Sequence, residues 1–212
     1  MNRLRVRFSR GDSVKFISHL DIVRLWHRAL RRAGIELAYT EGFNPHPRLS
    51  LAAPLALGIT SEAELMDVFV TRAISPHSFT AMLEQQLPPG IDIQQVCIVA
   101  TNLPALQAQL RFAEYRVEVT VEQAQAGTAI QEFLAKESLP WQHQRDTGLR
   151  SYDLRPLVDG LWTEDWHDGQ GVIGMKLRCD SQGSGRPEQV VRALGLGQPG
   201  AICRTRLVLE TG

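Results

Sequence analysis

The stretches LRVRFSRG (residues 4–11) and SHLDIVRLWHRALRRAG (residues 18–34) predict how the chain begins to fold. In the first stretch apolar residues alternate with basic ones, which is typical of a half-buried strand with arginines on its outer face. In the second stretch Ser18 is expected to cap a helix, apolar residues recur every three or four positions, and Gly34 ends the helix. The chain is therefore expected to open with a strand and an amphipathic helix.

The pattern that follows predicts two similar halves. Strands are expected around residues 48–52 and over 64–70, then a helix within 75–90 and a strand over 91–100. This order, β-α-β-β-α-β, is that of a ferredoxin-like domain. A second copy of the order is expected from segments 113–121, 124–138, 149–158, 172–179, 186–194 and 202–209. We predict an α+β protein with two ferredoxin-like βαββαβ halves packed together, over residues 1–101 and 113–212, joined by a linker at 102–112.

The charges of the chain are divided unevenly along its length. The 212 residues have a formal net charge of 0, and 43% of them are hydrophobic, which is enough for a substantial core. Residues 1–50 hold ten Lys/Arg and four Asp/Glu, a net charge of +6, and the remainder holds 13 and 19, a net charge of −6. Such a split suggests that one part of the chain meets an anion, although a solvated helix face would produce the same pattern.

The cysteines and the hydropathy pattern bear on cofactors and compartment. Cys97, Cys179 and Cys203 are far apart and form no CxxC motif, which argues against an iron–sulfur or zinc site within the chain. Their odd number, and a beginning that does not resemble a signal peptide, favour a reducing cytoplasm. No apolar run approaches the ~18 residues of a membrane helix. We expect a cytoplasmic protein with no membrane segment, no cofactor and no metal; the acidic set Glu62, Glu64 and Asp67 is a weak alternative metal site.

A row of arginines on the first helix is the main functional signal. Arg24, Arg28 and Arg31 recur at i, i+4 and i+7 on the side opposite the apolar residues. Like charges at this spacing repel each other, so the row favours an anionic partner over stability alone. The following EGFNPHPR (residues 41–48) is expected to be a rigid loop, because its two prolines restrict the backbone. The predicted anion- or RNA-binding residues are His19, Arg24, Arg28, Arg31, Phe43, Asn44, His46 and Arg48, with Arg5 and Arg7 extending the groove.

Two alternative functions remain open at this point. His19 and His46 would suit general acid–base catalysis in a metal-independent ribonuclease, phosphate binding without chemistry, or simple capping and packing. No serine elbow, P-loop or HExxH motif occurs, so no catalytic residue is assigned and it stays open whether the protein is an enzyme. Trp162 and Trp166 lie in DGLWTEDWHDGQG (residues 159–171), which is expected to be a long acidic loop. They suggest a protein–protein adaptor, or a loop pinned onto a sheet.

Residues 15–67 closely resemble the DUF2344 family, which is linked to radical S-adenosylmethionine (SAM) proteins. The resemblance rests on the SHLD helix, the EGFNPHPR loop and the stretch PLALGITSEAELMD, and GRPEQVVRAL and CRTRLVLE extend it towards the C-terminus. The family occurs free, fused to, or encoded beside a radical SAM protein, and its genes often neighbour an E/G-type ribonuclease and ribosomal protein genes. The resemblance implies a cytoplasmic accessory protein, with RNA and a radical SAM protein as partners, in RNA modification or maturation.

Overall fold

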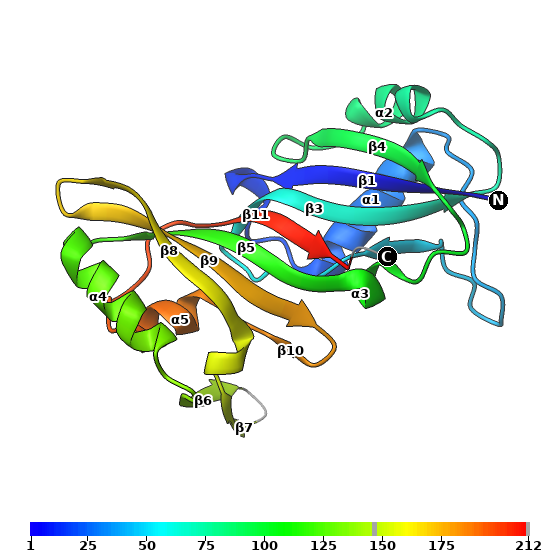
Figure 1. Ribbon diagram of the computed structural model, residues 1–212. Helices are drawn as coiled ribbons and strands as arrows, with labels where there is room; N and C mark the ends of the chain where they lie inside the picture. The colour runs from blue at the N-terminus through cyan, green and yellow to red at the C-terminus, as the bar shows by residue number, and fades with distance from the viewer. Residues whose placement is uncertain (146–147, 211–212) are drawn as a thin grey trace. The chain divides into compact units, whose positions relative to one another are not determined.

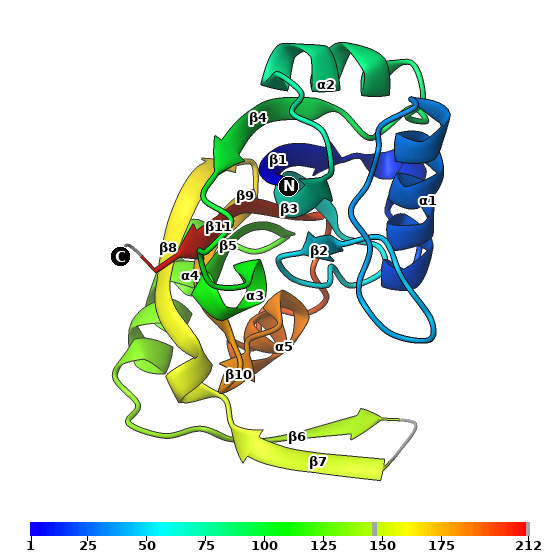
Figure 2. The same ribbon diagram turned by 90° about the vertical axis from the view of Figure 1, so that its right-hand side faces the viewer.

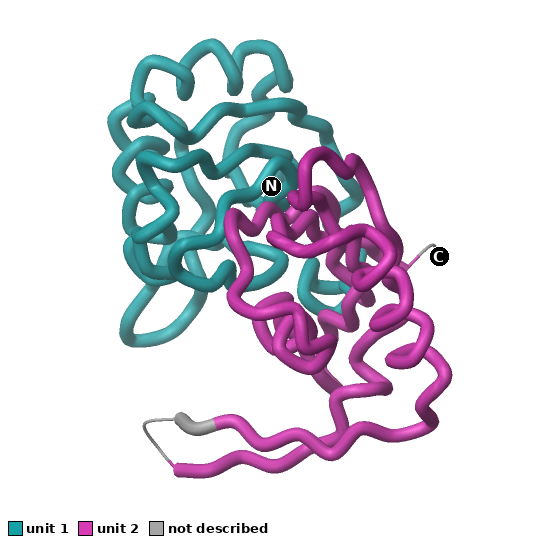
Figure 3. The backbone as a smooth tube through the Cα atoms, turned by 90° about the vertical axis from the view of Figure 1, so that its left-hand side faces the viewer, with its two compact units in different colours: residues 1–110, 212 teal, residues 111–211 magenta. Residues whose placement is uncertain are grey.

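The computed structural model describes residues 1–145 and 148–210. It is a mixed α/β structure in which the strands pair mostly in antiparallel fashion. The chain divides into two compact units, one up to Leu110 and the other from Arg111 onward (Figure 3). Within the described part of the chain, no helix has both the length and the apolar character that crossing a membrane requires.

The first unit follows the predicted order of elements. These are β1 (Asn2–Arg10), the single-turn helix η1 (Asp12–Val14), α1 (His19–Arg32), β2 (Leu49–Leu51), β3 (Thr60–Val70), α2 (Pro76–Glu84), β4 (Ile93–Val99) and the short α3 (Leu106–Gln109). β1 lies between β3 and β4 (Figure 1), β2 pairs with β3, and every pair is antiparallel. Ser18 caps α1 as expected, since its side chain accepts a hydrogen bond from the Asp21 backbone N–H.

One face of this sheet and the two longer helices enclose the core of the first unit. Leu4, Val6 and Phe8 of β1 are fully buried together with side chains from α1, α2 and β3. The rings of Phe8 and Trp26 meet edge to face with their centroids 4.8 Å apart. Each such side chain contributes ~1.5–3 kcal/mol when it leaves water. Because neighbouring side chains in a strand point to opposite faces, Arg3, Arg5 and Arg7 lie on the face without these helices, whereas Arg10 is buried on the other face and donates to the Val14 and Ile17 carbonyls.

The second unit contains a sheet, two helices and a separate hairpin. Its elements are β5 (Leu110–Val119), α4 (Gln123–Leu134), β6 (Pro140–Arg145), β7 (Gly148–Asp153), η2 (Arg155–Leu157), β8 (Val158–His167), β9 (Gln170–Asp180), β10 (Gly183–Ser184), α5 (Pro187–Ala193) and β11 (Ile202–Leu209). β9 pairs with β5 on one side and with β8 and β10 on the other, and β11 lies next to β5. β6 and β7 form a two-stranded sheet of their own (Figure 2).

The prediction of a long loop at residues 159–171 is wrong. This stretch is most of a hairpin in which β8 and β9 are joined by Asp168 and Gly169, both at positive φ (49° and 73°), as a two-residue type I′ turn requires. The predicted strand at 149–158 is accordingly divided among β7, η2 and the start of β8. Two glycines of β9, Gly171 and Gly174, make room for aromatic rings of β8.

Each tryptophan of the hairpin packs its ring against a glycine of β9. Trp162 is opposite Gly174 in the register, and a Cβ atom built on Gly174 would lie 2.1 Å from the indole Nε1. A Cβ atom on Gly171 would likewise lie 2.0 Å from the ring of Trp166. The indole N–H of Trp162 donates to Glu164, and that of Trp166 donates to the Val121 carbonyl. Both side chains thus have partners within the second unit, and the adaptor function stays a prediction.

Candidate anion-binding face

The outer side of α1 carries an excess of positive charge. Arg24, Arg28 and Arg31 are exposed, while the apolar residues on the opposite side of the helix are buried in the core. Among the described residues, the only ion pair on this side joins Arg24 Nη1 to Asp21 Oδ1 at 3.0 Å. A hydrogen bond from the Ser18 hydroxyl, followed by one from Arg24, lowers the pKa of Asp21 and keeps it ionised. Arg28 and Arg31 form no salt bridge within the described residues.

The segment after α1 closes into a small hydrogen-bonded loop. The Thr40 backbone N–H donates to the His46 carbonyl at 2.9 Å, and the His46 N–H donates to the Thr40 hydroxyl at 2.9 Å. Gly42 has a φ of 121°, which favours glycine, and the adjacent Phe43 side chain is 106% exposed. Asn44 is exposed beside it. The Phe43 ring therefore buries no apolar surface in the folded chain and is accessible on the closed loop.

This loop comes to α1 at His27, a residue that was not among the predicted site residues. Burial, and secondly the charge of His46, lower the pKa of His27. Its Nε2 atom is buried and has no hydrogen-bond partner in the described chain. His27 follows Arg24 by three residues and precedes Arg31 by four, so all three lie on one side of the helix. The spacing relative to the arginines was the signal in the sequence that would have identified it.

The structure separates His19 from this group along the helix. His19 is the first residue of α1 and precedes His27 by eight positions, a distance of ~12 Å along the axis. The histidine on which the charge of His46 acts is His27. An acid–base pair formed by His19 and His46 stays a prediction.

Arg48 also lies apart from the arginines of α1. Its guanidinium lies over the ring of Phe69, 4.2 Å from the centroid, and one of its nitrogens donates to the Met1 sulfur at 3.3 Å. Phe69 alternates along β3 with Val68 and Val70, which belong to the core, so Phe69 and Arg48 lie on the face of the sheet without α1. Arg5 and Arg7 lie on that face for the same reason. The sheet therefore prevents these three arginines from extending a groove lined by α1.

The acidic set of β3 does not gather around a common point. Asp67 accepts hydrogen bonds from Arg3 and Arg5, whereas Glu62 and Glu64 belong to the opposite alternation of the strand. In the part of the chain that the structure describes, no group of three or more His, Cys, Asp or Glu side chains is arranged to hold a metal ion.

Comparison with known proteins identifies a family and a fold. A family model described as "Uncharacterized protein conserved in bacteria" matches residues 3–187. No curated protein is significantly similar to the chain. A chain in the crystal structure of a Cbf5-Nop10-Gar1 complex is similar with a TM-score of 0.52 and 10% identity, covering 96% of this chain and 48% of that one. A chain in the structure of an H/ACA RNP bound to a substrate RNA has a TM-score of 0.47 and 11% identity, covering 97% and 47%.

The present chain thus spans about half the length of these solved chains. At 10% identity the similarity to the Cbf5 complex concerns the fold alone.

Proposed function

The chain belongs to the DUF2344 family, and we propose that its first unit binds RNA through the outer side of α1 and the loop that follows it. The observation that carries this proposal is the row of Arg24, Arg28 and Arg31, of which only Arg24 has an acidic partner in the described chain. The proximity of His46 to His27 supports placing the loop beside this row.

The length of the row favours a polymer over a small anion. Arg24 and Arg31 are seven residues apart, or ~10 Å along the helix, which exceeds the size of one phosphate group. The exposed ring of Phe43 is suited to stacking on a base, which contributes ~1–3 kcal/mol. A ligand with repeated phosphates and unpaired bases, that is single-stranded RNA, matches both features.

The family resemblance supports a more specific role. It favours a cytoplasmic accessory protein in RNA modification or maturation, acting with a radical SAM protein that supplies any radical chemistry. The RNA in one of the solved neighbours belongs to that complex, and the proposal here rests on the charges and the loop of this chain.

We also propose that both units are ferredoxin-like. The antiparallel order β4-β1-β3-β2 supports this fold for the first unit. The corresponding order β11-β5-β9-β8 supports it for the second, with the β6–β7 hairpin inserted after α4.

A second candidate function is a metal-independent ribonuclease. The observation in its favour is that the charge of His46 acts on His27, which lies on the same side of α1 as Arg24 and Arg31. Burial, and secondly this charge, lower the pKa of His27, so that it is available as a base. His46 would serve as the acid, and the arginines would hold the phosphodiester.

The test is a binding titration of the full chain with labelled single-stranded RNA at several salt concentrations. Each phosphate contact contributes about −0.7 to the slope of log affinity against log salt, so Arg28→Gln/Arg31→Gln is expected to make the slope shallower by about 1.4. An unchanged slope, or no affinity at low salt, would contradict the proposal. RNA that stays intact on a gel indicates a binder; cleavage that is lost in His46→Ala while binding persists indicates the ribonuclease.

A further inference from the structure

The face of the first unit's sheet without α1 and α2 contains a buried cluster of charges. Arg3 Nε and Nη2 donate to Asp67 Oδ2 at 2.9 and 2.5 Å, and Arg5 donates from Nε to Oδ1 at 2.8 Å and from Nη2 to Oδ2 at 3.1 Å. Arg3 is 2% exposed and Asp67 is 0% exposed. One carboxylate thus serves two guanidinium groups, and the cluster keeps a net charge of about +1 because arginine does not lose its proton.

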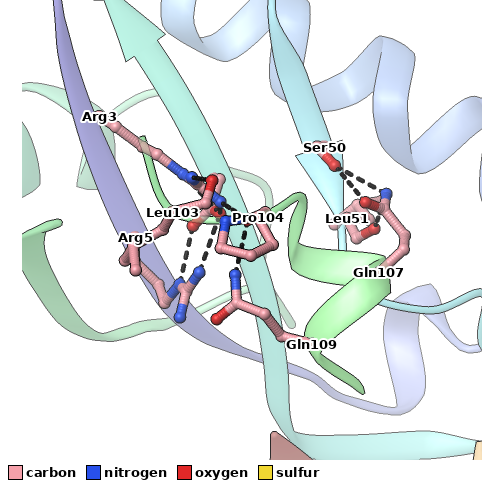
Figure 4. Close-up of polar contacts among 9 residues, drawn as sticks. Arg3, Arg5, Ser50, Leu51, Leu103, Pro104, Gln107 and Gln109 are labelled. Carbon is pink, nitrogen blue, oxygen red and sulfur yellow. Dashed lines mark hydrogen bonds and ion pairs between the residues drawn. The ribbon is translucent and has the colours of Figure 1, made fainter. Parts of the chain in front are cut away.

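The other partners of Arg3 are uncharged. Its Nη1 donates to the Leu103 carbonyl at 2.7 Å and its Nη2 to the Pro104 carbonyl at 2.9 Å (Figure 4). Gln107 binds Ser50 and the Leu51 carbonyl, and Gln109 binds the Pro104 carbonyl, which fixes the segment over the sheet. Residues 100–109 contain no acidic residue, and neither do β2 and β4. These elements therefore hold the arginines in place without neutralising their charge.

Two further arginines add to the charge of this face. Arg48 lies over one ring, that of Phe69, at 4.2 Å, and Arg3 lies over the same ring at 5.3 Å. Arg7 is exposed and follows Arg5 on the same face of β1, ~7 Å further along the strand. Neither Arg7 nor Arg48 forms a salt bridge within the described residues. These four arginines and Asp67 carry a net charge of +3. Asp92, whose carboxylate accepts a hydrogen bond from Ser9 beyond Arg7, reduces the excess on this side of β1 to +2.

A charge excess of this kind indicates an anionic ligand. Arg3 and Arg5, which are largely buried, share the one carboxylate of Asp67, and such cations cost free energy unless anions compensate them. Arg7 is exposed and Arg48 is half-buried, so both can be reached by a ligand. Arginine is the residue best suited to this task, because its planar guanidinium donates two parallel hydrogen bonds to phosphate oxygens. Arg7 and Arg48 have no carboxylate partner in the described chain, and Arg5 shares Asp67 with Arg3. This excess of guanidinium groups matches a phosphate dianion or successive phosphates better than a single carboxylate.

We propose that this face, the β1 arginine face of Arg5, Arg7 and Arg48, is a phosphate-binding site distinct from the outer side of α1. Arg5 and Arg7 contact the phosphate, Arg48 contributes charge at the Phe69 end, and Arg3 and Asp67 position Arg5. The site uses none of the residues on α1, so it does not depend on whether α1 binds RNA. The phosphate belongs either to a polynucleotide backbone or to a small phosphomonoester.

The test compares two double variants of the full chain in calorimetric titrations with inorganic pyrophosphate, adenosine 5′-monophosphate and a short single-stranded RNA. Arg7→Gln/Arg48→Gln is expected to weaken pyrophosphate binding at least about tenfold, as loss of charge-assisted hydrogen bonds does. The matched control Arg28→Gln/Arg31→Gln is expected to leave it unchanged. Nucleotide binding is compared in the Arg28→Gln/Arg31→Gln background, so that the α1 side does not contribute. Affinity that increases there from the mononucleotide to the RNA assigns the phosphate to a polynucleotide, and equal affinities assign it to a phosphomonoester.

The opposite result overturns the proposal. If wild type binds neither pyrophosphate nor nucleotide, or if Arg7→Gln/Arg48→Gln binds as wild type does, the arginines of this face have a structural role only. Should the double variant fold poorly, the single exposed substitution Arg7→Gln replaces it and is likewise expected to weaken pyrophosphate binding. If Arg28→Gln/Arg31→Gln loses RNA binding but retains pyrophosphate binding, the RNA site lies on α1 and the phosphate site on the β1 arginine face is supported.

Discussion

His27 connects the chemistry of the loop to the stability of the fold. Its pKa is lowered by burial and secondly by the charge of His46, so the unfolded chain takes up this proton at a higher pH than the folded chain does. The folded state therefore loses stability as pH falls below the ordinary histidine pKa of about 6.5, and gains nothing further above it. We expect His27→Gln to reduce the loss of stability between about pH 7.5 and pH 5.5.

Urea unfolding at the two pH values measures this effect. His77→Gln, an exposed substitution in α2, serves as the control and is expected to retain the dependence of wild type. An identical pH dependence in His27→Gln and wild type would mean that His27 titrates as an ordinary surface histidine.

Asp67 is the residue whose loss we expect to destabilise the first unit most. Asp67→Asn leaves Arg3, which is 2% exposed, without its counter-charge, and breaking one partner of a buried pair costs ~3–5 kcal/mol. Asp12→Asn removes the exposed partner of Lys15 and is expected to cost ~0–1 kcal/mol. Comparing the free energies of unfolding of the two variants in urea tests the difference; equal values would show that the buried cluster relaxes freely.

At the scale of elements, the β8–β9 hairpin depends on a glycine opposite a tryptophan. Gly174→Ala places a methyl group where the Trp162 ring lies, so the ring must move, at a cost of ~1–3 kcal/mol. Gly127→Ala in α4 meets no atom within 4 Å and is expected to stabilise the chain by ~0.5–1 kcal/mol.

A double-mutant cycle identifies the cause of the first effect. If the ring is responsible, Gly174→Ala costs less when Trp162 is already alanine. Thermal unfolding of the four proteins, followed by circular dichroism, gives the coupling, and additive effects would assign the cost to the backbone instead.

At the scale of the whole molecule, the division of charge predicts where salt sensitivity arises. Residues 1–50 carry a net charge of +6 and the remainder −6, although the chain as a whole is neutral. We expect Arg150→Gln/Arg206→Gln, two exposed substitutions in the second unit, to change the salt slope of RNA binding by less than about 0.3, because each true phosphate contact contributes about 0.7. A change as large as that in Arg28→Gln/Arg31→Gln would extend the RNA site to the second unit.

The order of elements in the first unit could be predicted from the sequence, because the features that produce it are local. Alternation in β1, the Ser18 cap and the apolar period of α1 act over a few residues, and the structure contains each of them. The second unit was harder to predict, because the β8–β9 hairpin depends on contacts between Trp162 and Gly174 across two strands. The β6–β7 hairpin likewise gave no distinct signal of its own.

Which side of α1 is basic follows from the sequence alone, since residues on one helix keep a regular angular spacing. Which distant residues approach each other depends on the folded chain. It placed His46 beside His27, and it brought Arg48 to the opposite side of the sheet from the α1 arginines. Local periodicity is set by backbone geometry within one helix or strand. The positions of His46 and Arg48 depend instead on how the loop folds back and on which face of the sheet each residue lies. No short-range sequence pattern encodes these long-range positions.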